Sequence, residues 1–238
     1  MSAKKKKKLY EGKTKTLYET EAPEQLILTF RDEVPLPNNK VLAVEGKGEI
    51  NNRVSALLCR YLESYHIPTH FVEIIARDSM TVRTLDMIPV TLMLHNFAGA
   101  ALSKRTGLKE GKVLNKPMLE YRFKDEARKD DFPGRNDVLA AGFVTSPDLH
   151  ILERYANKIN VLLKSFFVRR GFQLENTQLE FGRAKNRMVL GDELSLDTCH
   201  LLEGQSGDKI FSSRSYNDAA ALQKIYLELG ARILSANV

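Results

Sequence analysis

The sequence has few of the residues that build disulfide-linked or metal-clustered scaffolds. Its only two cysteines are Cys59 and Cys199, which are far apart in the chain. This argues against a disulfide framework and against a zinc cluster, and it fits a reducing compartment such as the cytoplasm. No apolar run approaches the ~20 residues that a membrane-spanning helix needs, so we expect no membrane association. Lys4 to Lys8 have no apolar stretch behind them, so we expect no secretory signal.

A nucleophile placed beside a base is also missing. Cys59 falls on a predicted helix next to its buried stripe and is expected to pack there. His66 and His70 flank Pro68 and are expected to be structural, and no pair of histidines has metal-ligand spacing. The residue types therefore favour phosphate, Mg²⁺ and carboxylate chemistry over acyl-enzyme or zinc chemistry.

The charge is unevenly distributed. The formal net charge is +6, but five of the lysines lie in one segment, Lys4 to Lys8, and the rest of the chain is close to balanced. A basic chain of this kind can bind nucleic acid or phosphorylated small molecules. We interpret the lysine run as a solvated tail and expect no nucleic-acid partner.

The hydrophobic pattern predicts a chain of the α+β class. Alternating strands joined by turns dominate residues 1–95, with a loop rich in Pro, Asn and Gly at 33–48 and one helix at about 49–66. Residues 96–238 contain longer helices, at about 146–170 and 218–234. We predict two lobes, a β-rich nucleotide-binding lobe at 1–95 and an α/β lobe at 96–238 that carries the metal and the acceptor substrate.

The segment 172–196 is predicted to form two strands joined by a short basic turn. The first strand ends near Glu180, and the second leads into Asp192 and Glu193. Residues near facing ends of an antiparallel pair lie close together. Converging carboxylates are costly unless a cation holds them, so the pattern fits either a Mg²⁺ site or a solvated acidic tip.

Two glycine-containing segments are candidate phosphate binders. The turn at Gly12 has Lys13 and Lys15 beside it, although it lacks the second glycine and the Gly-Lys-Ser/Thr ending of a Walker loop. It is either a phosphate-binding hairpin or a plain β-turn. Lys47, between two glycines at the start of a predicted helix, marks either an anion site or a flexible helix entry.

A series of ordered motifs resembles one known family. The segments are KLYEGKTKTLY (8–18), FRD (30–32), EGKGEINNRVS (45–55), IPTHF (67–71), MIPV (87–90), SKRTGLKEG (103–111), QLEFG (178–182) and GDELSLDTC (191–199). Together they resemble the SAICAR synthetase family of purine biosynthesis, and the resemblance covers nearly the whole chain. It implies a two-lobe fold related to ATP-grasp enzymes and protein kinases, with ATP between the lobes.

The resemblance also implies a reaction. It predicts a cytoplasmic ligase that joins an imidazole ribotide carboxylate to the amine of L-aspartate through an acyl phosphate, with ATP converted to ADP and phosphate. Family members are commonly oligomeric, so a homo-oligomer is expected. The residues that the resemblance assigns to ATP are Gly12, Lys13, Lys15 and Met87. Those assigned to Mg²⁺ are Glu180 and Asp192, which with Lys13 form the predicted catalytic set.

The positions that recognise the ribotide differ from the family pattern. His95 stands in place of an Arg and Ala101 in place of a Ser, while Asn176 and Gln178 replace an Asp and a Lys, and His200 replaces an Arg. Other candidate substrate contacts are Lys104, Arg105, Lys124 and Arg214.

Three functional interpretations follow. The first is a divergent SAICAR synthetase in which Arg214, or protonated His95 and His200, compensates for the lost arginines. The second is a paralogue that performs the same ligase chemistry on another carboxylate without a ribose phosphate. The third is a regulatory protein that binds ATP without turnover, against which the presence of Glu180 and Asp192 argues.

Overall fold

The computed structural model describes residues 3–36, 40–124, 132–204, 209–211 and 218–235. The chain divides into two compact units. Unit 1 comprises Met1–Thr84, Glu193–Asp197 and Phe211–Val238, and unit 2 comprises Leu85–Asp192 and Thr198–Ile210. This division differs from the predicted lobes at 1–95 and 96–238, because the strand that follows Leu85 pairs within unit 2 and the C-terminal helix packs within unit 1.

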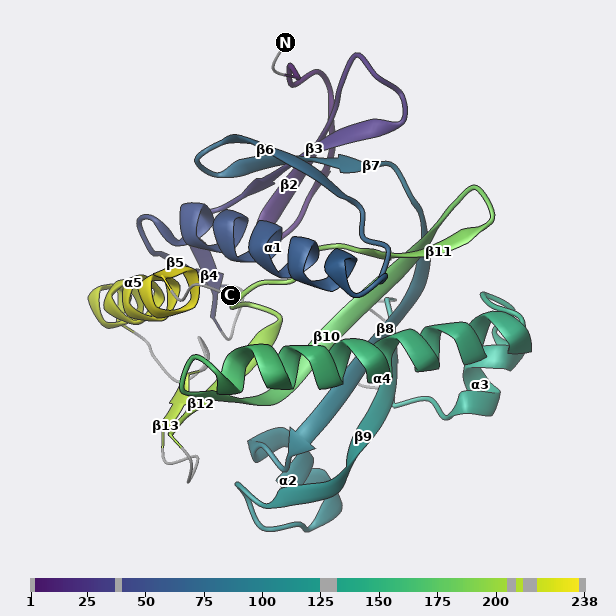
Figure 1. Cartoon of the computed structure of the whole chain (residues 1–238), viewed down its shortest axis with the longest axis vertical. Coiled ribbons are helices and arrows are strands. Elements are labelled where there is room, and N and C mark those ends of the chain that lie inside the picture. The colour runs from purple at the N-terminus through teal and green to yellow at the C-terminus, as the bar shows by residue number, and fades with distance from the viewer. Residues whose placement is uncertain (1–2, 37–39, 125–131, 205–208, 212–217, 236–238) are drawn as a thin grey trace. The chain divides into compact units, whose positions relative to one another are not determined.

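Unit 1 is built on a five-stranded antiparallel sheet (Figure 1). Its strands, in spatial order, are β1 (Lys8–Glu11), β2 (Lys15–Glu19), β3 (Gln25–Phe30), β7 (Ser79–Arg83) and β6 (Phe71–Ala76). The helix α1 (Lys47–Ser64) packs on β3, β6 and β7, and α5 (Ala219–Ser235) packs alongside α1. The segment predicted as a loop forms a short ribbon, β4 (Glu33–Pro35) paired with β5 (Val41–Ala43).

Helical spacing of apolar residues explains why α1 forms and which face it buries. Val54, Leu58 and Leu62 are fully buried, at positions four residues apart. The helix begins after Gly46, whose φ of +81° is a conformation that glycine adopts without a Cβ clash. On α5, a Cβ at Gly230 would lie 2.8 Å from Cγ2 of Ile50, so the glycine permits the close packing of α5 on α1.

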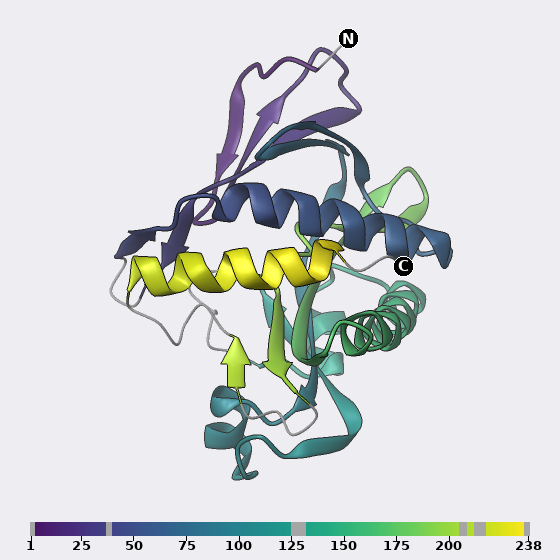
Figure 2. The ribbon, with the colours of Figure 1, turned by 60° about the vertical axis from the view of Figure 1, so that its left-hand side comes forward.

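Unit 2 is built on a six-stranded antiparallel sheet. Its main path is β13 (Lys209–Phe211), β12 (Cys199–Glu203), β10 (Phe172–Ala184), β8 (Asp86–Phe97) and β9 (Val113–Phe123), and β11 (Arg187–Gly191) pairs with β10. The long helix α4 (Ser146–Val168) packs on β10 (Figure 2). The two shorter helices are α2 (Ala100–Thr106) and α3 (Arg135–Ala140).

The helix α4 follows its predicted apolar stripe. Leu149, Leu152 and Ile159 are buried, and the hydroxyl of Thr145 accepts a hydrogen bond from the backbone N–H of Asp148. The sequence predicts Ser146 as the N-cap, and that prediction is one residue out, because the capping oxygen is that of Thr145. The observed α+β class with antiparallel sheets agrees with the prediction.

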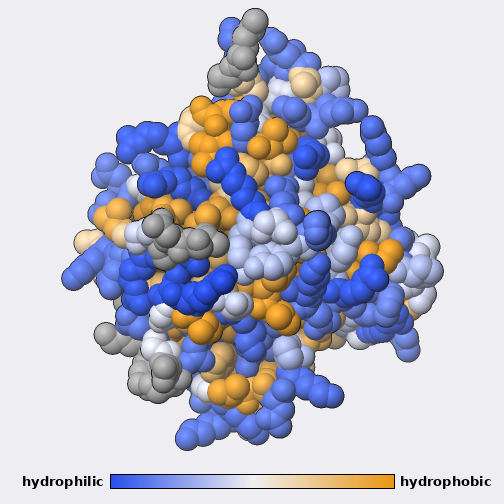
Figure 3. Space-filling model, in the orientation of Figure 1, coloured by the Kyte–Doolittle hydropathy of each residue, from blue (hydrophilic) through white to orange (hydrophobic). Residues whose placement is uncertain are grey.

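The surface carries mainly hydrophilic residues on the face seen in Figure 3, with smaller hydrophobic patches between them. Among the described residues, no helix combines the length and the apolar character that crossing a membrane would require.

Candidate active site

The β10–β11 hairpin of unit 2 carries the two predicted metal-binding carboxylates. Glu180 pairs with Gly191, and Ala184 pairs with Arg187, so the turn consists of Lys185 and Asn186. The predicted pair of strands with a short basic turn is therefore confirmed, but the predicted end of the first strand near Glu180 is wrong, because pairing with β11 extends β10 to Ala184. Asp192 follows the partner of Glu180 directly and has a φ of +57°. A positive φ is uncommon for a residue with a side chain and is often found at functional sites.

The carboxylate of Glu180 is held by neighbouring strands. One oxygen, Oε1, accepts a hydrogen bond from the Thr91 hydroxyl at 3.1 Å. The other, Oε2, accepts from the ammonium group of Lys124. Lys124, predicted as a substrate contact, thus compensates the negative charge of Glu180 in this structure. The described residues contain no group of three or more His, Cys, Asp or Glu side chains that could hold a metal ion by themselves.

Two glycines shape the surface around Met87 on β8. A Cβ at Gly191 would lie 2.9 Å from the sulfur of Met87, and one at Gly182 would lie 3.1 Å from the same atom. A side chain at Gly191 would require Met87 to shift, and one at Gly182 would also collide with the backbone oxygen of Asp86 at 2.9 Å. Met87 is 36% exposed, so part of its side chain remains available to a ligand.

In unit 1, the β1–β2 turn presents the predicted phosphate-binding lysines. The turn is closed by a hydrogen bond from the backbone N–H of Gly12 to the carbonyl of Lys15, at 2.8 Å. Lys13 is exposed and forms no hydrogen bond or ion pair with any described residue. Lys15 donates to Glu193 Oε1 at 3.2 Å, and the Thr14 hydroxyl donates to the same oxygen at 2.9 Å.

The structure gives different roles to the adjacent carboxylates at the end of the hairpin. Glu193 is buried in unit 1, where it also accepts a hydrogen bond from Ser195 Oγ at 2.5 Å. Its side chain therefore orders the β1–β2 turn through Thr14 and Lys15. Asp192 belongs to unit 2. Of the two, Asp192 is the one that we retain as a candidate metal ligand.

A second buried cluster in unit 1 was not predicted. Lys47, with no exposed surface, donates to Asp197 Oδ2 at 2.6 Å, and Asn51 Nδ2 donates to the same oxygen at 2.9 Å. The hydroxyl of Tyr226 donates to the other Asp197 oxygen. The possible anion site at Lys47 is therefore not supported, because Asp197 already neutralises its ammonium group.

Three of the predicted substrate positions form one row across the sheet of unit 2. Asn176 on β10 pairs with His95 on β8 and with His200 on β12. Gln178 and Glu180 follow on the same face of β10, pairing with Met93 and Thr91. At about 3.3 Å per residue, Asn176 and Glu180 are roughly 13 Å apart along the strand.

Two atoms in this row are buried with no hydrogen-bond partner among the described residues. They are Nδ1 of His95 and Oδ1 of Asn176. Buried polar atoms without a partner are rare and costly, so each one in a native structure calls for a ligand, a water molecule or an ion. A substrate that hydrogen-bonds to both atoms would remove that cost.

Two side chains near the row, His95 and Arg105, lie against the same carboxylate. His95 Nε2 lies 3.0 Å from Glu120 Oε2, and Arg105 binds the other oxygen of Glu120. Burial raises the pKa of Glu120, but the hydrogen bonds from His95 and Arg105 outweigh burial and hold that pKa below its usual value. Ala101 and Lys104 are exposed on α2, and Arg214 lies outside the described residues.

Comparison with known proteins decides the family. Residues 8–217 match the family model described as SAICAR synthetase. The chain belongs to the SAICAR synthetase family. Its relatives include phosphoribosylaminoimidazole-succinocarboxamide synthases from Acidithiobacillus ferrooxidans, 36% identical over 94% of each chain, and from Pelodictyon phaeoclathratiforme, 38% identical over 97% of this chain and 98% of the relative.

Solved structures confirm the SAICAR synthetase fold. The crystal structure of phosphoribosylaminoimidazole-succinocarboxamide synthase from Ehrlichia chaffeensis matches with a TM-score of 0.90 at 29% identity, over 98% of this chain and 100% of that one. A structure described as SAICAR synthetase (Type-2) in complex with ADP matches with a TM-score of 0.88 at 28% identity, over 96% and 98%. As a SAICAR synthetase family member, the chain is an ATP-dependent ligase that forms a carbon–nitrogen bond.

Proposed function

We propose that this chain joins the carboxylate of carboxyaminoimidazole ribotide to the amine of L-aspartate, using ATP, in purine biosynthesis. Family membership over nearly the whole length supports the reaction. The observation that carries the proposal is the β10–β11 register, which pairs Glu180 with Gly191 and so puts Asp192 one residue beyond the partner of Glu180. The two buried cysteines form no disulfide, which fits a reducing cytoplasm.

Met87, Lys13 and Lys15 each have surroundings that suit one part of a nucleotide. In unit 2, Met87 lies against two glycines with its side chain partly exposed, which suits a flat adenine ring. In unit 1, Lys13 has an uncompensated charge, and Lys15 is held beside it by Glu193, which suits phosphate oxygens. A relative's structure described as a complex with ADP supports nucleotide binding.

The carboxylates of Glu180 and Asp192 would hold Mg²⁺. Their oxygen atoms are the ligands that Mg²⁺ prefers, and it usually takes only one or two protein carboxylates together with phosphate and water. Lys124 already places a cation on Glu180, so that position tolerates positive charge. Bound there, the ion would supply neutralisation of phosphate charge.

The proposed chemistry has two steps. A carboxylate oxygen of the first substrate attacks the γ-phosphorus of ATP and displaces ADP, which gives an acyl phosphate. The amine of aspartate then attacks the acyl carbon, phosphate leaves with the bonding electrons, and the amine loses a proton to solvent. The side chains of Lys13 and Lys15 contribute by orienting the phosphates and by balancing their charge.

A second candidate substrate class is favoured by the pairing around Glu120. Arg105 already binds the Glu120 carboxylate, and His95 lies against the same carboxylate, so Arg105 brings no uncompensated charge to a ribose phosphate. The row of His95, Asn176 and His200 offers hydrogen-bonding atoms instead. This arrangement suits a carboxylate substrate whose far end is polar but not phosphorylated.

A substrate screen tests both candidates. ADP release would be followed with the ribotide plus aspartate, and then with other carboxylates and amines. The first proposal predicts ATP-dependent product from the ribotide, with micromolar or tighter affinity by calorimetry. Weak ribotide binding, together with turnover on a carboxylate that lacks phosphate, would favour the second candidate. ATP binding without turnover on any pair would contradict both.

A further inference from the structure

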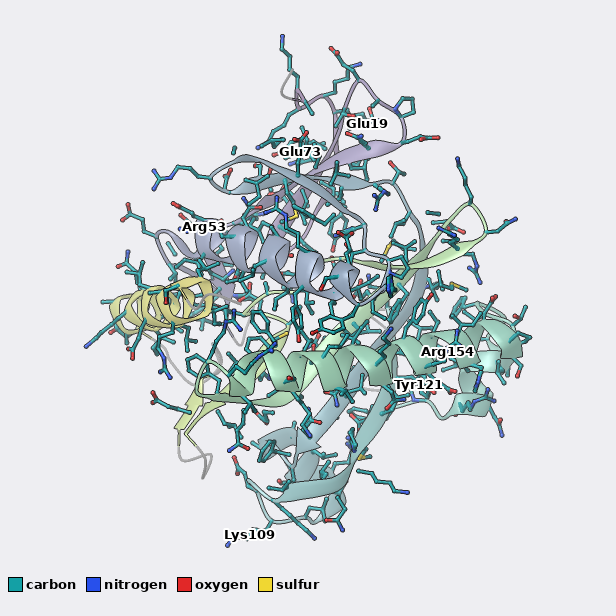
Figure 4. The ribbon with its side chains drawn as sticks, viewed as in Figure 1. Glu19, Arg53, Glu73, Lys109, Tyr121 and Arg154 are labelled. Atoms are coloured by element: carbon teal, nitrogen blue, oxygen red, sulfur yellow. The ribbon has the colours of Figure 1, made fainter. Side chains whose placement is uncertain are left out.

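Unit 2 contains a cavity that the proposed reaction does not use. It has a volume of about 380 Å³ and lies between the first half of α4 and the tip of the β10–β11 hairpin. The residues that matter for its chemistry are Arg154, Tyr155, Arg183, Lys185, Arg187 and Met188. Figure 4 labels Arg154 on α4.

The cavity and the candidate active-site residues lie on opposite faces of β10. Successive side chains of a strand point to opposite faces of a sheet. Gly182 faces the sulfur of Met87, whereas Arg183 reaches the carboxylate of Asp148 on α4 at 3.1 Å. Arg183 and its β11 partner Met188 therefore face the cavity, and Gly182 faces the side of Glu180. Lys185, Asn186 and Arg187 line the cavity at the tip of the hairpin.

The cavity concentrates positive charge. Four of its lining residues are Arg or Lys, and Asp148 is its single carboxylate. Burial raises the pKa of Asp148, but its bonds with Arg183 and Thr145 outweigh burial and hold that pKa low, so Asp148 offsets Arg183. Arg154, Lys185 and Arg187 form no hydrogen bond or ion pair with any other described side chain.

The backbone of the tip fixes the position of these charges. Lys185 has a φ of +55°, and the turn is only two residues long between the paired Ala184 and Arg187. Three cationic positions are therefore held within five residues of a tight hairpin. Such a conformation costs free energy for a residue with a side chain and is common where a site needs it.

Apart from Asn186, the remaining lining residues are apolar or aromatic: Ile151, Tyr155 and Met188. The Tyr155 ring packs against Phe181 with centroids 6.5 Å apart, and Met188 is buried beneath the hairpin. A cavity of this size, with an aromatic wall and a few convergent polar groups, matches a small-molecule site. The cations would bind an anionic group, and the ring wall would pack against a planar one.

We propose that this cavity is a second binding site, for a phosphate-bearing small molecule with a planar ring, of the class of a nucleoside monophosphate. The phosphate contacts Arg154, Lys185 and Arg187, and the planar ring packs on Tyr155. An extended polyanion such as single-stranded nucleic acid would need a groove of basic residues beyond the cavity, and the lining residues instead form one compact pocket that opens to solvent.

Nuclear magnetic resonance titration tests the proposal. Inorganic phosphate, adenosine and AMP would be added separately to the labelled full chain at constant ionic strength, with a saturating ATP analogue present. The backbone signals of 185–187 should shift saturably with phosphate and with AMP, and AMP should bind at least about tenfold more tightly than either phosphate or adenosine. Absence of saturable shifts at these residues would overturn the proposal.

Matched variants localise the binding. Arg187→Ala should weaken AMP binding by about tenfold or more, because one charge-assisted contact is lost. Lys164→Ala removes an exposed, unpaired charge on α4 away from the cavity, and it should leave the affinity unchanged. Equal affinities for the wild type and Arg187→Ala would refute the site.

Two further results separate this proposal from others. A single-stranded oligonucleotide that binds more tightly than AMP, and loses binding in Arg187→Ala, would overturn the small-molecule class. Arg187→Ala without added AMP should turn over the ligase substrates at the wild-type rate, because Arg187 lies at the tip of the hairpin, about 13 Å along β11 from Gly191, the partner of Glu180. Failure of the ligase reaction in the wild type would leave the AMP titration unaffected, so the two proposals fail independently.

Discussion

The two ends of one face of β10 differ in how their polar groups are satisfied. At Glu180, both carboxylate oxygens have a partner, Thr91 for one and Lys124 for the other. Four residues earlier, Asn176 Oδ1 and the neighbouring His95 Nδ1 are buried with no partner among the described residues. The hydrogen-bonding groups of Glu180 have partners without a ligand. The buried atoms at Asn176 and His95 carry a desolvation cost, which hydrogen bonds to a ligand would remove.

This difference separates chemistry from recognition. A charged group that must hold a cation is kept in place by its neighbours beforehand. A group that reads a substrate has open hydrogen-bonding capacity when the substrate is absent. The same strand would therefore place the reacting phosphates at Glu180 and the recognised part of the carboxylate substrate at Asn176.

The largest expected effect comes from the Glu180 end of β10, which we call the charged end. Asp192→Asn should lower turnover about a thousandfold or more, because the side chain loses the charge that would hold Mg²⁺. Asn tolerates the left-handed backbone of Asp192 better than most residues, so the fold should persist. Steady-state ADP release measures the loss of turnover, and thermal unfolding checks that the fold persists.

The control for this prediction is Asp86→Asn on β8. Asp86 is exposed and pairs with Arg183 in the register, away from the proposed ligands. It should keep wild-type turnover. Normal product formation by Asp192→Asn would show that the charged end of β10 is not where the metal acts.

The next effect concerns two buried carboxyl groups near the Asn176 end of β10, which we call the recognition end. Replacing each group should change the free energy of unfolding, and the two changes should depend on pH with opposite signs. The pKa of Glu120 is lowered by His95 and Arg105 despite its burial, so its charged form stabilises the fold above its usual pKa. Glu120→Gln should cost about 2–3 kcal/mol at neutral pH. The difference in unfolding free energy between the wild type and Glu120→Gln should disappear as the pH falls through the lowered pKa of Glu120.

Glu175 provides the matched opposite. Burial raises its pKa, so its ionisation destabilises the fold as the pH rises through the raised pKa. Glu175→Gln should therefore become more stable than the wild type as the pH increases. Denaturant unfolding from about pH 2.5 to pH 8 measures both curves. Parallel curves for the two variants would show that Glu120 and Glu175 do not differ in environment as described.

The local architecture could be predicted from the sequence where short-range patterns determine it. The helices α1 and α4 and the β10–β11 hairpin follow from apolar spacing and turn residues. The short elements α3 and β12 carry too few residues for a clear period and were not predicted.

The long-range parts of the site could not be derived in this way. The row of His95, Asn176 and His200 exists because β10 lies between β8 and β12, and no local pattern encodes that strand order. The contact of Lys47 with Asp197 joins residues 150 positions apart. A lysine flanked by glycines therefore suggested a ligand site, although its partner is a distant carboxylate of the same chain.

A smaller effect is expected at the recognition end itself. Asn176→Ala should raise KM for the carboxylate substrate about tenfold, because the substrate loses a hydrogen bond, while kcat changes little. The unfolding free energy should change by less than about 1 kcal/mol, since one polar atom of the side chain has no partner to lose. Asn157→Ala, at an exposed position of α4, is the control and should leave KM unchanged.

The smallest effect should come from Thr91, the hydrogen-bond partner of Glu180. Thr91→Val removes the hydroxyl that donates to Glu180 at 3.1 Å and keeps the β-branched shape, so it should cost about 1 kcal/mol and lower kcat by less than about tenfold. Thr177→Val is the matched control on β10, because its hydroxyl faces only the sulfur of Cys199 at 3.5 Å, a weak hydrogen-bonding partner. If Thr177→Val lowers kcat as much as Thr91→Val, the loss reflects strand packing. A loss confined to Thr91→Val shows that the orientation of the Glu180 carboxylate matters for turnover.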